Sequence, residues 1–170
     1  MGKFSRKTVF KTAVALLFAG FAGASQAHAA DLVKLPAFTL PDLDGKEWKS
    51  SELAGKACVV DFWATWCNTC KETIPKLAEL SDKYKGKGLT VVGISVDKGS
   101  AEKIRKAAKK LGINYLVLLD KDNTLSKTFG FNGIPSLYVF DRKGALKTAM
   151  PGYDPDQEAQ LTQAAEKAMN

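Results

Sequence analysis

The sequence predicts an α/β domain in which helices flank a central mixed sheet. Short apolar, β-branched segments alternate with amphipathic helical segments, a pattern typical of parallel strands covered by helices. The last two strand segments are joined by a tight turn and so predict an antiparallel pair. A chain of 170 residues, 45% hydrophobic and 25% charged, is long enough for one such domain.

The net charge of +7 is concentrated at the N-terminus. No acidic residue precedes position 30, but four basic residues do: Lys3, Arg6, Lys7 and Lys11. The remaining 21 basic and 18 acidic residues give only +3, which does not indicate a nucleic-acid-binding surface. The single histidine, His28, lies in the same segment, so residues 30–170 have no imidazole for acid–base chemistry or metal binding.

Residues 1–29 have the order of a secretory signal peptide. A basic stretch is followed by the apolar run AVALLFAGFAGA at 13–24 and by Ala27-His28-Ala29, a small-x-small cleavage site. The run is shorter than the about 20 residues that a membrane-spanning helix needs, and an uncleaved anchor is the alternative. We therefore expect residues 30–170 to be exported without stable membrane insertion, to a compartment that permits disulfides.

Four elements are expected before residue 85: a hairpin around the turn sequence PDLDG, one helical turn, a buried strand with the sequence CVVDFW, and a long helix. They occupy, in order, 37–40 with 47–49, 50–54, 58–63 and 67–84. Pro75 lies inside the long helix and is expected to kink it.

The rest of the chain predicts a strand, a helix, a strand, a short helix, a hairpin and a last helix. They are expected at 89–96, 101–111, 115–119, 124–129, 136–141 with 145–150, and 155–168. The helix at 101–111 is amphipathic and is followed by Gly112, a common helix end. Asp154 is a good N-cap for the last helix, and Pro155 a good first residue.

The clearest chemical signal is WCNTC at 66–70, between a buried strand and a helix. Cys67 is expected in the first helical turn, where backbone N–H groups and the helix dipole favour a thiolate. Cys70 lies one turn further on, so the pair can open and close: Cys67 attacks a substrate disulfide and Cys70 resolves the mixed disulfide. The alternatives are a static disulfide, or a zinc site that would need two further ligands.

Cys58, the third cysteine, begins the buried strand at 58–63. We interpret it as a small buried hydrophobic residue. The alternative is a further redox-active thiol or one that forms dimers.

Two segments resemble the signatures of thioredoxins: VDFWATWCNTCK at 60–71, and GIPSLYVF at 133–140, whose proline is cis in that family and faces the two cysteines. With the hairpin, the leader and a helix and strand inserted between the motifs, residues 35–168 resemble the periplasmic TlpA/ResA-type thiol–disulfide oxidoreductases. The resemblance implies a thioredoxin fold with an N-terminal β-hairpin extension and an inserted helix–strand. It also implies a redox-active Cys67–Cys70 disulfide with no bound cofactor or metal.

The resemblance implies roles for residues outside the cysteine pair. Asp61 would be buried behind Cys70 and would take its proton; the alternative is an exposed aspartate at a strand end. Pro135 would be cis and would present the neighbouring backbone to an extended substrate. The expected substrate-binding rim consists of three residues: Trp66, Gly133 and Ile134.

The sequence departs from the family pattern at three places. Asn68-Thr69 replaces the Gly-Pro of thioredoxins, and Thr73 stands where periplasmic relatives often have a glutamate. Gly93 takes the place of a lysine that thioredoxins put near the buried aspartate. These departures affect the direction of electron flow, the fit to haem apoproteins and the surroundings of Asp61.

By resemblance, the protein is expected to reduce protein disulfides in the periplasm, with electrons from a DsbD-type membrane donor, in cytochrome c maturation or disulfide homeostasis. One alternative is a peroxidase on the same fold, although only Thr65 fits the peroxiredoxin loop and residues 30–170 have just two arginines, Arg105 and Arg142. The other is a copper-binding chaperone, a class that expects a histidine ligand.

Overall fold

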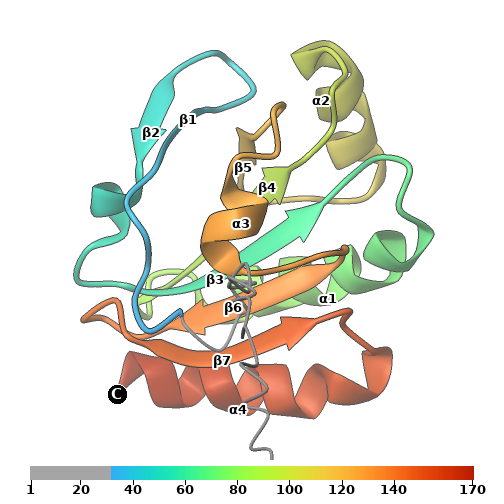
Figure 1. Ribbon diagram of the computed structural model, residues 1–170. Coiled ribbons are helices and arrows are strands. Elements are labelled where there is room, and N and C mark those ends of the chain that lie inside the picture. The colour runs from blue at the N-terminus through green and yellow to red at the C-terminus, as the bar shows by residue number, and fades with distance from the viewer. Residues whose placement is uncertain (1–31) are drawn as a thin grey trace, which may run out of the picture.

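The computed structural model describes residues 32–170; the predicted signal peptide at 1–29, with His28, lies outside them. A five-stranded mixed sheet forms the centre (Figure 1). Its strands, from one edge to the other, are β5 (Leu116–Leu119), β4 (Leu89–Ser95), β3 (Ala57–Trp63), β6 (Ser136–Phe140) and β7 (Leu146–Pro151). β3 pairs parallel with β4 and antiparallel with β6, which confirms the predicted mixed sheet.

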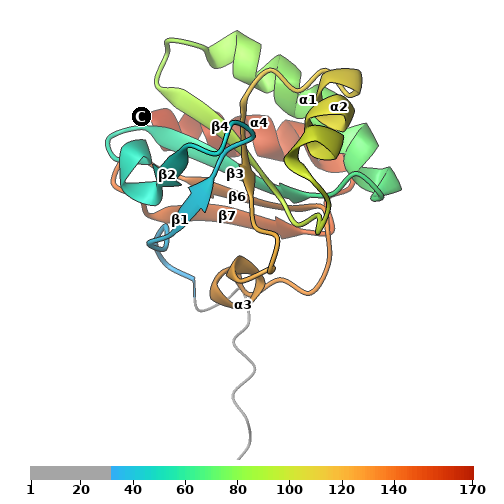
Figure 2. The same ribbon diagram turned by 90° about the horizontal axis from the view of Figure 1, so that it is seen from above.

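Helices cover both faces of this sheet, as Figure 2 shows from above. α1 (Asn68–Tyr84) and α4 (Glu158–Met169) lie on one face, and α2 (Ala101–Lys110) lies beside α1. The short α3 (Leu125–Phe129) lies against the other face. The fold is thioredoxin-like, with α2 and β5 as the inserted helix and strand.

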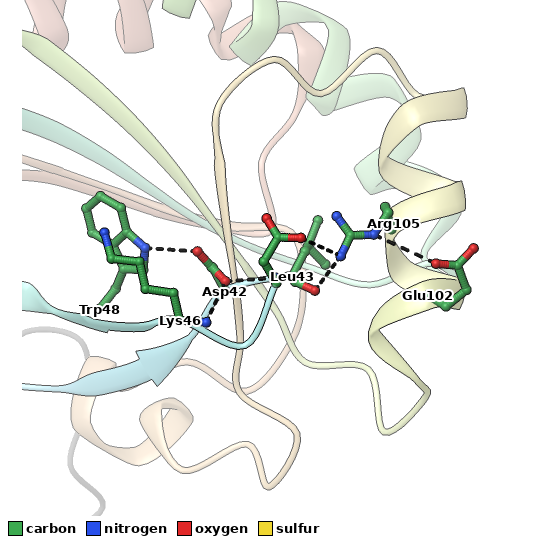
Figure 3. A network of polar contacts seen from close by, with 7 residues as sticks. Asp42, Leu43, Lys46, Trp48, Glu102 and Arg105 are labelled. Atoms are coloured by element: carbon green, nitrogen blue, oxygen red, sulfur yellow. Dashed lines mark hydrogen bonds and ion pairs between the residues drawn. The ribbon is translucent and has the colours of Figure 1, made fainter.

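The predicted N-terminal hairpin forms a separate two-stranded sheet of β1 (Thr39–Pro41) and β2 (Glu47–Lys49), followed by the 3-10 turn η2 (Ser50–Leu53). Asp42 shapes its loop because one carboxylate oxygen accepts the N–H groups of Asp44 and Lys46, at 2.8 and 3.0 Å. Arg105 reaches from α2 to the same loop, where it donates to the Leu43 carbonyl at 2.5 Å and pairs with Asp44 at 2.9 Å (Figure 3).

β3 is buried along its whole length, which explains why all of its residues except Asp61 are apolar. On the α3 face, Phe62 packs edge-on against Phe129, with ring centroids 4.8 Å apart. On the opposite face, Val59 belongs to a cluster that joins the sheet to Leu77 of α1 and Leu161 of α4. Side chains of β3 therefore alternate between two cores.

The last helix departs from the prediction. Residues Pro155–Gln157 form a 3-10 turn, η3, and the α-helix begins only at Glu158. The reason is local: the Asp154 carboxylate accepts the N–H of Asp156 at 3.0 Å, while the Gln157 side chain accepts the N–H of Asp154 at 3.1 Å. These bonds close a tight turn rather than the first turn of an α-helix. No helix within residues 32–170 is long and apolar enough to cross a membrane.

Candidate active site

The two cysteines of the WCNTC segment are bonded to each other. Cys67 and Cys70 form a disulfide with their Cα atoms 5.3 Å apart. Cys67 is the N-cap of α1 and not part of its first turn, because its backbone is extended, with φ −81° and ψ 110°. In this place its sulfur accepts the N–H of Cys70 at 3.1 Å, as an N-cap side chain does. As the N-cap, Cys67 still places its sulfur at the positive end of the helix dipole, as expected.

The two sulfurs differ in access to solvent. Cys70 is completely buried, Cys67 is 6% exposed, and the adjacent Trp66 is 65% exposed. The Thr69 hydroxyl lies 3.5 Å from the Cys67 sulfur and can donate a hydrogen bond to it. Of the two cysteines, Cys67 is the one that retains exposed surface.

The second signature lies against this sulfur. The Ile134–Pro135 peptide bond is cis, as predicted, and the Ile134 carbonyl oxygen lies 3.8 Å from the Cys67 sulfur. Gly133 is exposed and Ile134 half-buried. The Pro135 carbonyl accepts the N–H of Gly152 at 2.8 Å, which ties this turn to the end of β7. The structure thus brings Ile134 to the disulfide, with Gly133 next to it on the surface.

Asp61 lies in the interior of β3 and is completely buried, so the alternative of an exposed strand end is wrong. Neither of its carboxylate oxygens has a hydrogen-bond partner within residues 32–170. Burial raises the pKa of Asp61 from 3.8 to about 7. Its neighbour in β4 is Gly93, which has no side chain to bring a charge to the carboxyl.

A network that the sequence analysis missed holds the loop before Cys67. The buried Asp97 accepts the N–H and the hydroxyl of Thr65, at 2.8 and 2.7 Å, and the hydroxyl of Ser95 at 2.9 Å. Asp97 follows the carboxyl end of β4, beside the end of β3. The sequence feature that could have indicated this role is an acidic residue directly after a buried parallel strand. This carboxylate fixes the backbone that leads into the disulfide.

The residues of α1 that depart from the family pattern make hydrogen bonds within the helix. The Thr73 hydroxyl donates to the Thr69 carbonyl at 3.2 Å, and the Asn68 side chain accepts from the Lys71 ammonium at 2.8 Å. Both contacts stabilise the first turns of α1. Neither brings a carboxylate or an ammonium group to the sulfur of Cys67.

Cys58 lies apart from the other two cysteines. It is free, 1% exposed and packed in the core on the α3 face, whereas Cys67 and Cys70 pack with Trp63 in another cluster. Burial raises the pKa of its thiol to about 12. Among residues 32–170, no three His, Cys, Asp or Glu side chains are grouped to hold a metal ion.

Comparisons with known proteins agree with this geometry. The profile of the AhpC/TSA family matches residues 33–149. The chain belongs to the AhpC/TSA family. It is 28% identical over 148 residues to the thiol-disulfide oxidoreductase ResA of Bacillus thuringiensis (strain Al Hakam), which covers 82% of this chain and 85% of the relative.

Solved structures give the same result. A candidate thiol:disulfide interchange protein DsbE from Chlorobium tepidum superposes with a TM-score of 0.76 at 28% identity, over 81% of this chain and 96% of that chain. The thioredoxin domain of a thiol-disulfide oxidoreductase from Bacteroides vulgatus superposes with a TM-score of 0.69 at 27% identity, over 81% and 96% of the two chains. The chain is a thiol–disulfide oxidoreductase of the thioredoxin superfamily.

Proposed function

We propose that the protein reduces disulfides of exported proteins in the periplasm, with Cys67 as nucleophile and Cys70 as resolving thiol. The observation that carries this proposal is the asymmetry of the pair: the sulfur of Cys67 is accessible and faces a helix N-terminus, while Cys70 is completely buried. An attacking thiolate needs access and stabilisation, whereas a resolving thiol needs only to reach its partner one turn away.

The reaction consists of two exchanges. The Cys67 thiolate attacks one sulfur of the substrate disulfide, which forms a mixed disulfide and releases the other substrate sulfur as a thiolate. Cys70 then attacks the Cys67 sulfur, which closes the Cys67–Cys70 disulfide and releases the second substrate thiolate. Two electrons pass from the protein to the substrate. Asp61 accepts the proton of Cys70 before the second exchange, because a carboxyl with a pKa of about 7 can exchange a proton near neutral pH.

The surroundings of Cys67 support reduction rather than oxidation. Its sulfur has the Cys70 N–H at 3.1 Å and the Thr69 hydroxyl at 3.5 Å as donors, and both are uncharged groups. The Lys71 ammonium, in the first turns of α1, donates to the Asn68 side chain. A strong oxidant stabilises its reduced form by stabilising the thiolate, so moderate stabilisation favours electron donation.

Substrate contacts are proposed at the rim of the disulfide. The exposed Trp66 offers an apolar surface, and the Ile134 carbonyl oxygen lies 3.8 Å from the Cys67 sulfur. An extended substrate segment would pair with this backbone as an added strand. Because Thr73 offers no acid, we propose general disulfide homeostasis as the main role, with apocytochrome c as one substrate among others.

We place the mature chain in the periplasm because residues 1–29 have the order of a cleaved signal peptide. The reductant would be a membrane protein of the DsbD type, and no bound cofactor is required, since the disulfide itself carries the electrons.

Peroxide reduction is not favoured. Of the arginines after position 30, Arg105 is bound to the hairpin loop and Arg142 donates to the Met169 carbonyl at 2.7 Å.

Insulin reduction with dithiothreitol as electron source tests the proposal. We expect Cys67→Ser to abolish turnover, and Cys70→Ser to accumulate a mixed disulfide on Cys67 that mass spectrometry detects. Cys58→Ser is the matched control and retains turnover. A reduction potential as high as that of strong disulfide oxidants, measured against glutathione, would contradict the proposed direction.

A further inference from the structure

Three side chains with buried polar atoms converge on the face of the sheet that α1 and α4 cover. Strand alternation puts Asp61 and Trp63 on the face of β3 that carries Val59. Gly93 is the β4 neighbour of Asp61. A Cβ atom at Gly93 would lie 3.1 Å from Nε1 of Trp63 and 3.1 Å from Cε2 of Tyr115. The missing side chain at Gly93 therefore lets the indole and the phenol approach the carboxyl.

The polar atoms of this group are all without a protein partner. Both carboxylate oxygens of Asp61, Nε1 of Trp63 and the hydroxyl of Tyr115 are buried, and none has a hydrogen-bond partner within residues 32–170. Burial and then the charge of Asp61 raise the pKa of Tyr115 well above its ordinary value, so the two groups interact electrostatically. An ordered water molecule binds where several donors and acceptors surround one buried site.

Tyr115 also reaches an open cavity. It directly precedes β5 and lines a cavity of about 230 Å³ between β5, α2 and the hairpin loop. Its hydroxyl is buried, yet the residue as a whole is half-buried. Arg105, which also lines this cavity, holds the hairpin loop in place there (Figure 3). Tyr115 thus extends from an open cavity toward the buried carboxyl.

We propose that Tyr115 is a positioning residue for the proton of Asp61 and that, with Trp63, it holds a water molecule against the carboxyl. The inference rests on the proposed function, in which Asp61 takes the proton of Cys70. Asp61, with the water that Tyr115 and Trp63 hold, keeps that proton while the Cys67–Cys70 disulfide is closed. When the electron donor reduces the disulfide again, the leaving Cys70 thiolate takes the proton back, and Asp61 is left ionised for the next cycle.

The strand neighbours of Asp61 do not exchange its proton. The residues paired with it are Gly93 in β4 and Leu137 in β6, and neither titrates. From α1, Ile74 and Cys70 belong to the cluster that contains Trp63. Cys70 is the proton donor in the reaction, and Tyr115 is a titratable group on which the charge of Asp61 acts.

Carbon-13 NMR of aspartate-labelled, reduced protein tests this directly. Tyr115→Phe removes one hydroxyl and the donor that stabilises the charged carboxyl, so the pKa of Asp61 is expected to rise by about one unit, a tenfold change in proton affinity. Tyr153→Phe is the matched control: its hydroxyl is also buried without a partner, but the charges that act on it are Glu158 and Asp154. An unchanged pKa in Tyr115→Phe, or an equal rise in Tyr153→Phe, would overturn the inference.

The pH profile of insulin reduction is the second readout. Tyr115→Phe should slow turnover about fivefold at pH 7 in the parent, because a rise of one unit in the pKa lowers the ionised fraction of Asp61 by about that factor, and it should have no further effect in Asp61→Asn. Equal slowing in both backgrounds would show a merely structural role and overturn the inference. If the parent does not reduce insulin but the NMR shift is present, the proposed function fails, while the coupling of Tyr115 to Asp61 stands. If the parent reduces insulin but Tyr115→Phe leaves the pKa of Asp61 unchanged, the proposed function stands and this inference fails.

Discussion

The buried carboxyl of Asp61 couples the stability of the protein to pH. Burial raises its pKa from 3.8 to about 7, so the folded chain binds this proton more tightly than the unfolded chain. The stability contributed by the neutral carboxyl is therefore fully present below pH 3.8 and is lost as the pH rises through about 7. A shift of about three units corresponds to about 4 kcal/mol of unfolding free energy.

Asp61→Asn removes this dependence because an amide is uncharged at every pH. We expect the free energy of unfolding of the variant, relative to that of the parent, to increase by about 4 kcal/mol between about pH 4 and pH 8. Urea unfolding of the oxidised proteins measures it, and any constant cost of the substitution cancels in this comparison. Asp122→Asn changes an exposed aspartate and should follow the parent. Parallel curves for Asp61→Asn and the parent would refute the reasoning.

Three further predictions concern residues around the site. Cys58 should resist iodoacetamide in the native reduced protein while Cys67 reacts, because Cys58 is 1% exposed with a thiol pKa of about 12; rapid labelling of Cys58 would contradict its assignment to the core. Asp97→Asn should lower the free energy of unfolding by about 3 kcal/mol, since Thr65 loses a charged acceptor, and an unchanged urea midpoint would argue against this. Arg105→Met should speed amide exchange in the hairpin loop while exchange in β3 stays unchanged, and equal exchange rates in the loop would exclude a role for the ion pair.

The fold was predictable because its strongest signals are local. A seven-residue strand buried on both faces must be mostly apolar, and the sequence ACVVDFW shows this directly. The cis bond before Pro135 and the burial of Asp61 followed from motif resemblance rather than from periodicity. Element boundaries were less accurate: Cys67 caps α1 instead of opening it, because the choice depends on a single pair of backbone angles.

The remainder of the site was not predictable, because it depends on contacts between distant segments. Thr65 and Asp97 are 32 residues apart, and nothing local to either indicates the pairing. Tyr115 approaches Asp61 only because the registers of β3, β4 and β5 align Asp61, Gly93 and Val117 in one row. A sequence shows that a carboxyl is buried in a strand, but not which side chains from neighbouring strands surround it.

The N-terminal hairpin has a consequence for self-association. β5 is an edge strand, and an exposed edge can pair with a strand of another chain and begin aggregation. An isolated bridge joins Asp42 to Leu118 of β5, and Arg105 fastens the same hairpin loop to α2. The hairpin therefore shields this edge, as charged residues or bulges do in other sheets. The chain can keep the apolar sequence LVLL in an edge strand without offering it to a second molecule.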